Sequence, residues 1–180
     1  MYGTSHLSIS CNWDKNTGWT RTGDIVILVH TNGLNPFIVP SSFASPGLKD
    51  LVSYNDPKKL ILELYQHNLP NMIKNCIVVP PLSLFGGNIT IPIPTMDDAT
   101  YNLVTIVTKI SPSQSLFTAT TLVIDKEVSP KVSPMWVYDA NVSREQHPTN
   151  EPRQSATAFD RITTLLFKGF PISVGNITYS

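Results

Sequence analysis

Runs of β-branched and apolar residues, separated by turn residues, recur along most of the chain and predict a protein rich in β-strands. Residues 24–31 (DIVILVHT) are almost wholly apolar, which is typical of a strand buried on both faces. Residues 101–110 alternate apolar and polar side chains and predict a strand, and residues 116–125 predict another. We expect further strands at 6–11, 72–79, 88–93 and 170–179. Prolines in 88–93 make that segment an edge strand or a strap.

Three segments carry helix signals. Ser45-Pro46 pairs an N-cap residue with a proline at the first helical position, which predicts a short helix to Tyr54. Asp56-Pro57 repeats this signal before an apolar pattern with helical spacing, and that helix should end near Asn68. The pattern consists of Leu60, Ile61, Leu64 and Tyr65. A third helix is predicted over 155–168, with Gly169 as its stop signal.

Together these elements predict a single α+β domain, an antiparallel β-sheet with two or three packed helices. Residues 1–23 are polar, lack the pattern of a core element and contain Trp13 and Trp19, which are favoured anchors at interfaces. We therefore interpret 1–23 as a candidate self-association arm and 24–180 as the globular domain.

The charge composition excludes several classes of protein. Only 14% of the 180 residues are charged, and 13 basic side chains balance 13 acidic ones. Normal hydrophobicity with little charge argues against disorder and against a coiled coil. The absence of a basic excess argues against a protein that grips naked nucleic acid, whereas zero net charge permits self-association. We expect no signal peptide, no membrane span and a cytosolic protein, with Cys11 and Cys76 as buried free thiols.

Catalytic signals are missing from the sequence. It contains no glycine-rich phosphate loop, no zinc-protease motif and no nucleophile elbow. Its four histidines are dispersed, and His30 ends a buried strand, which is typical of a satisfied core residue. The adjacent Asp97-Asp98 is better explained as a turn than as a metal site. We therefore expect a protein that is not an enzyme and that has no cofactor and no metal.

Two proline-bounded loops and one basic cluster are the candidate contact sites. The loops 36–40 and 80–86 carry Phe37 and Phe85, which either cover the core or contact a neighbouring copy or a bilayer. The basic cluster consists of Lys49, Lys58 and Lys59. These lysines form either a solvated helix face or a contact with acidic lipid or an acidic partner.

The last third of the chain resembles the C-terminal half of rhabdovirus matrix proteins. The similarity lies in a strand ending in an acidic residue (116–125), a Pro-Met-Trp-Val-Tyr-Asp segment (134–139), a helix through Phe159-Asp160-Arg161 to Lys168, and a closing strand. The size is similar to the matrix proteins of plant-infecting cytorhabdoviruses. The lysine-rich N-terminal arm of animal-virus members and their Pro-Pro-x-Tyr motif are both missing.

The resemblance implies a matrix protein that self-assembles, condenses the helical nucleocapsid and links it to the envelope. Its implied partners are further copies of itself, the viral nucleoprotein, the glycoprotein tail and the inner leaflet of the membrane, with no sequence-specific nucleic acid binding. Its implied location is the virion beneath the envelope and, in the host, the cytoplasm and membranes. The alternatives are a jelly-roll capsid subunit of a small virus and a small enzyme or ligand-binding domain.

Overall fold

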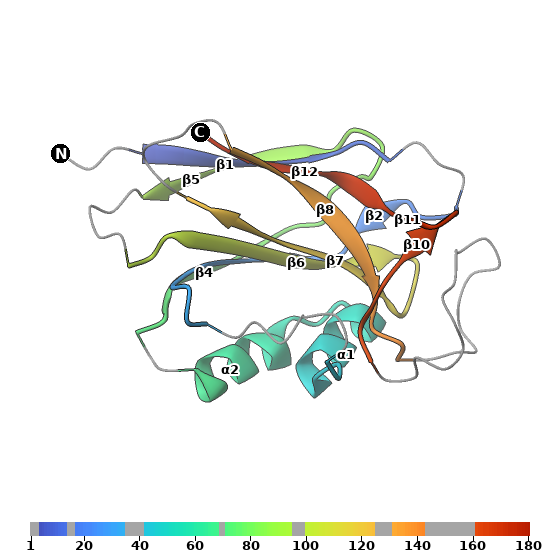
Figure 1. The fold of residues 1–180 in the computed structure, drawn as a ribbon, viewed down its shortest axis with the longest axis horizontal. Helices are drawn as coiled ribbons and strands as arrows, with labels where there is room; N and C mark the ends of the chain where they lie inside the picture. Colours follow the sequence, from blue (N-terminus) through green and yellow to red (C-terminus); the bar gives the residue numbers. More distant parts are fainter. Residues whose placement is uncertain are drawn as a thin grey trace.

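The computed structural model describes residues 4–13, 17–34, 42–68, 71–94, 100–124, 131–142 and 161–180. Two helices pack on one side of a large antiparallel sheet (Figure 1). The helices are α1 (Pro46–Tyr54) and α2 (Lys58–His67). The strands are β1 (Thr4–Cys11), β2 (Arg21–Thr22), β3 (Ile25–His30), β4 (Ile73–Val79), β5 (Asn88–Pro94), β6 (Leu103–Ser111), β7 (Leu116–Val123), β8 (Lys131–Asp139), β9 (Thr163–Thr164), β10 (Leu166–Phe167), β11 (Phe170–Pro171) and β12 (Ser173–Tyr179).

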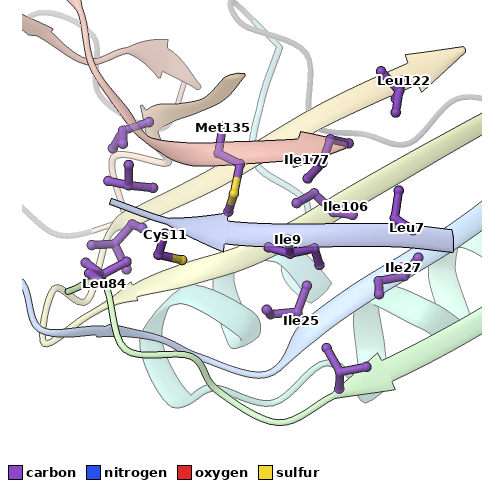
Figure 2. Close-up of a cluster of buried hydrophobic side chains, with 14 of the residues drawn as sticks. Leu7, Ile9, Cys11, Ile25, Ile27, Leu84, Ile106, Leu122, Met135 and Ile177 are labelled. Atoms are coloured by element: carbon purple, nitrogen blue, oxygen red, sulfur yellow. The ribbon is translucent and has the colours of Figure 1, made fainter. Parts of the chain in front are cut away.

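Ten of these strands form one sheet, with the order β4-β3-β6-β7-β8-β12-β1-β5, while β2 pairs with β6 and β9 with β8. The sheet curls into a half-barrel, so that its inner face encloses a cluster of buried apolar side chains. Side chains of β1, β3, β6, β8 and β12 meet in this cluster (Figure 2). Most of the strands that the sequence predicts are present, including the proline-containing edge strand β5.

The prediction of an α+β fold is wrong, because the two helices are short and the chain is mostly β. The third predicted helix accounts for much of the error. Residues 155–160 lie outside the described residues, and 161–168 contain β9 and β10 in place of a helix. Lys168 and Gly169 have φ values of 53° and 83°, as in a two-residue hairpin turn of type I′. Gly169 therefore joins β10 to β11 and does not end a helix.

The helices cover the outer face of the sheet over β3, β6 and β7, where a second apolar cluster forms. Leu48 and Leu51 of α1 and Leu60 and Leu64 of α2 are each at most 1% exposed and contribute to this cluster. Helix α1 begins at Pro46, where the sequence predicts, and the Ser45 side chain accepts a hydrogen bond from the Leu48 N–H. Helix α2 begins at Lys58, one residue after the predicted start.

The N-terminal segment is part of the core and is not an exposed arm. β1 lies inside the sheet between β12 and β5. Trp13 and Trp19 are 7% and 0% exposed, and the Trp13 indole N–H donates to the Thr17 hydroxyl. The predicted boundary between residues 23 and 24 also separates β2 from β3, which lie along the same edge of β6. The two tryptophans therefore offer no surface to a second copy in this structure.

Candidate functional site

The described residues form neither a candidate metal site nor a reactive thiol site. No group of three or more His, Cys, Asp or Glu side chains among them could hold a metal ion. Burial raises the pKa of Cys11 to about 11 and also raises the pKa of Cys76, so both thiols stay protonated and poorly nucleophilic at neutral pH. No helix among the described residues is long and apolar enough to cross a bilayer.

His30 is a satisfied core residue, as the sequence predicts. It is 2% exposed, and its Nδ1 lies 2.6 Å from the Thr31 carbonyl oxygen. Because that carbonyl can only accept, Nδ1 carries the proton, and Nε2 accepts from the Thr105 hydroxyl at 2.6 Å. Burial lowers the pKa of His30, which keeps the ring neutral.

An exposed aromatic hairpin is the most distinctive surface feature. It consists of β10, the Lys168-Gly169 turn and β11, and its two strands pair with each other and with no other described strand. Its exposed apolar side chains are Leu166 at 37%, Phe167 at 45% and Phe170 at 74%. Figure 1 shows the hairpin at one end of the molecule, on the right of the view. We call residues 166–171 the aromatic hairpin.

The aromatic hairpin also carries a cation. The Lys168 ammonium lies 5.6 Å from the centroid of the Phe167 ring. No acidic residue occurs between 166 and 171, so the local charge is positive. Buried residues anchor the hairpin at both ends, because Leu165 and Ile172 belong to the inner cluster and the Leu165 N–H donates to the Val137 carbonyl. The hairpin thus presents two phenyl rings and one ammonium from a fixed base.

Sequence reasoning missed this site because it assigned 155–168 to a helix. A usable signal was nevertheless present. A residue followed by glycine, with an aromatic side chain on each side, is typical of a two-residue hairpin turn. Phe167 and Phe170 stand directly opposite each other in the β10–β11 register, as this turn requires.

The structure places one of the two predicted contact phenylalanines. Phe85 is 59% exposed in the connection between β4 and β5, beside the fully buried Leu84. Leu84 therefore covers the core, whereas contact of Phe85 with a neighbouring copy or a bilayer stays a prediction. Phe37 lies outside the described residues.

The three predicted lysines lie in or beside the helices but differ in their surroundings. Lys58 and Lys59 are exposed at the start of α2. The Lys59 ammonium forms an ion pair with Asp50 of α1 at 3.5 Å. Lys49 is half-buried and also has an interaction partner. The cluster therefore has less unpaired positive charge than the sequence alone suggests.

No protein-family model matches this chain, and no curated protein matches it significantly. Any functional assignment must therefore rest on the chain's own residues and geometry.

Proposed function

We propose that this protein is a non-enzymatic structural protein that attaches to an anionic membrane surface through the aromatic hairpin, in the manner of a viral matrix protein. The observation that carries the proposal is the exposure of Phe167 and Phe170 beside Lys168 on a hairpin that no other described strand covers.

The composition of the hairpin suits the boundary between lipid headgroups and acyl chains. Phenylalanine side chains can bury at the boundary between headgroups and acyl chains, and a lysine beside them can keep its ammonium among the headgroups. A positive tip without a nearby acid in the hairpin is complementary to anionic lipid. For these reasons we favour a membrane over an apolar groove of another protein.

The expected affinity of one copy is low. Complete burial of a phenylalanine side chain contributes about 1.5–3 kcal/mol, and a lysine near an anionic surface contributes about 1 kcal/mol. Partial insertion of two rings with one lysine therefore yields about 4 kcal/mol, which corresponds to a dissociation constant near the millimolar range. Stable attachment then requires many copies that act together, as in a matrix layer.

Self-association completes the proposal. A protein with zero net charge repels its own copies weakly, and Phe85 is an exposed apolar side chain away from the aromatic hairpin in sequence. Attachment to the nucleoprotein and the glycoprotein tail, and a location beneath the envelope, follow from the resemblance to rhabdovirus matrix proteins. The helix on which part of that resemblance rests is replaced by strands over 161–168.

The capsid alternative fits the strand order less well. A jelly roll divides eight strands between two facing sheets. Among the described residues ten of the twelve strands form one continuous curled sheet, in which β6, β7 and β8 are consecutive neighbours. This arrangement is the reason that we prefer the matrix role to a shell-forming one.

Flotation with lipid vesicles tests the proposal. Wild type should float with vesicles that contain anionic lipid, and floating should decrease as salt rises. The double variant Phe167→Ser/Phe170→Ser should lose floating at an unchanged melting temperature. Leu62→Ser is the matched control, because Leu62 is 55% exposed on α2 and its loss should not affect floating. Equal floating of the wild type and the double variant would contradict the proposal.

A further inference from the structure

Strand β4 is an open edge of the sheet. It pairs with β3, and no other described strand pairs with its second side. The Thr31 N–H donates to the Met72 carbonyl at 2.9 Å. Because backbone polar groups alternate in direction along a strand, those of Ile77 point to β3, whereas those of Cys76 and Val78 point away from the sheet. These two outward residues therefore offer N–H donors and carbonyl acceptors that no described residue binds.

The opposite edge of the sheet, β5, is protected in a way that β4 is not. The His6 backbone exchanges hydrogen bonds with Ser180, at 2.8 and 3.0 Å, and therefore points away from β5. Pro92 lies opposite His6, so its nitrogen points outward, as does that of Pro94 two residues later. A proline nitrogen has no proton to donate, and prolines on an edge strand hinder pairing with another chain. No proline occurs between 71 and 79, so β4 lacks this protection.

Apolar side chains flank the open edge. Val78 is 43% exposed and Cys76 is half-buried, and both lie on the outer face of the sheet, where α2 packs. Tyr65 of α2 is 44% exposed. Burial raises the pKa of the Tyr65 hydroxyl, and the Cys76 thiol raises it further, which places Tyr65 beside β4. Ile77 is half-buried on the inner face. The edge therefore combines unpaired backbone groups with apolar surface on both faces.

We propose that β4 pairs antiparallel with β4 of a second copy about a two-fold axis, so that the two sheets join into one. Cys76 then lies opposite Val78 of the second copy, and Ile77 lies opposite its own equivalent on the inner face. This inference goes beyond the proposed function, since it rests on strand geometry and not on the aromatic hairpin.

The sequence of β4 fits its own copy in this register. A shift by two residues would pair an outward residue with Lys74, at the β-bulge, or with Pro80, which has no N–H. In the proposed register Lys74 lies opposite Pro80 of the second copy, so the two Lys74 side chains are about 20 Å apart. This separation exceeds the Debye length of about 8 Å at physiological salt, whereas parallel pairing would bring the two ammonium groups together. We therefore favour a second copy over a strand of another protein.

Sedimentation equilibrium of the full chain without lipid tests the interface. The wild type should form a dimer as its concentration rises. Val78→Lys should raise the dissociation constant of the dimer about tenfold or more, because each dimer contains the change twice. Val78→Pro should act in the same direction, since it removes an outward N–H and no bond to β3. Val132→Lys is the matched control, because Val132 is 58% exposed on β8, which lies inside the sheet, and it should leave the dimer unchanged.

Disulfide cross-linking tests the register. In Val78→Cys the new thiol should lie opposite Cys76 of the second copy, at a Cα separation of about 5.5 Å that a disulfide can span. Copper phenanthroline should therefore cross-link this variant rapidly, and Cys76→Ser/Val78→Cys much more slowly. Cys11 is 3% exposed and should not react.

Three results would overturn the proposal. They are a wild type that stays monomeric, equal dissociation constants for Val78→Lys and Val132→Lys, and equal cross-linking of Val78→Cys and Cys76→Ser/Val78→Cys. Because no lipid is present in either experiment, these results are separate from those of vesicle flotation, which tests the membrane role.

Discussion

Trp13 and Trp19 stack on each other with ring centroids 4.9 Å apart and an angle of 25° between their planes. The stack belongs to the inner apolar cluster, and the backbone N–H of Trp13 donates to the Leu84 carbonyl at 2.9 Å. This contact joins the segment between β1 and β2 to the connection between β4 and β5. The N-terminal residues are therefore tied to the middle of the chain.

Trp19→Ala should reduce the free energy of unfolding by about 3–5 kcal/mol, because it leaves a large cavity in the inner cluster. Removal of residues 1–19 should prevent folding, since it takes β1 from between β12 and β5. Denaturant titration and near-UV circular dichroism check both outcomes. A cooperatively folded truncated protein would mean that β1 is dispensable.

Gly47→Ala should destabilise the protein, although alanine is normally better than glycine in a helix by about 1 kcal/mol. A Cβ at position 47 would lie 2.4 Å from the Leu60 backbone nitrogen and 2.5 Å from Glu63 Oε2. The Gly47 N–H also donates to Glu63 Oε1 at 2.7 Å. Thermal unfolding measures the effect, with the exposed Gln66→Ala as a control. Stabilisation by Gly47→Ala would show that α1 and α2 pack less closely at Gly47 than the structure shows.

The strands and the first two helices could be predicted because local signals and tertiary structure agree there. The run 25–30 is apolar at every position, and all six residues are buried. Pro92 and Pro94 mark an edge, and β5 is the last strand of the sheet. Prolines are tolerated there because their missing N–H groups cost no bond when they face away from β1.

The remaining errors have physical causes. Ile162 and Leu166 have the spacing of one helix face. In the structure, however, Ile162 is buried directly before β9, and Leu166 is exposed on β10. Pairing of β9 with β8 therefore overrides the local helical pattern. Trp13 and Trp19 lack any periodic pattern because neither belongs to a strand or helix, so only the fold shows that they are buried together.

The stability of the protein should decrease as the pH falls below about 6.5, the pKa of histidine in the unfolded chain. The pKa of His30 is lower in the folded state, so below pH 6.5 the unfolded chain binds more protons than the folded one. The stabilisation by the buried neutral ring of His30 is thus present above pH 6.5 and is lost as the pH falls towards the pKa of His30 in the folded protein. Denaturant titrations from pH 7.5 to 5.5 measure the slope, which His30→Gln should reduce. Parallel curves for the two proteins would argue against a buried neutral His30.

Gly169→Val should disrupt the aromatic hairpin without unfolding the protein. Valine at a φ of 83° is strained by about 1–3 kcal/mol, and β10 and β11 pair only with each other among the described strands. Vesicle binding should be lost while the Tm changes by only a few degrees. A large decrease in Tm would show that the hairpin supports the core.

Lys168→Asn separates the charge of the hairpin from its shape. Asparagine followed by glycine is favoured in a type I′ turn, so the hairpin should persist without its ammonium. Binding to neutral vesicles should stay unchanged, whereas the preference for anionic vesicles and its salt dependence should decrease. Measurement of vesicle binding against salt concentration checks this. An unchanged salt dependence would assign the electrostatic contact to other cations, such as Lys58.

The most direct test of the membrane role follows the environment of residue 170 itself. In Phe170→Trp the added indole should lie at the exposed tip, whereas in the wild type Trp13 and Trp19 are buried and Trp136 is half-buried. Subtraction of the wild-type emission isolates the new tryptophan. On anionic vesicles its fluorescence should shift to the blue and be quenched by lipids brominated on their acyl chains. Vesicle binding without either change would contradict the account, because the protein would then attach through a different surface.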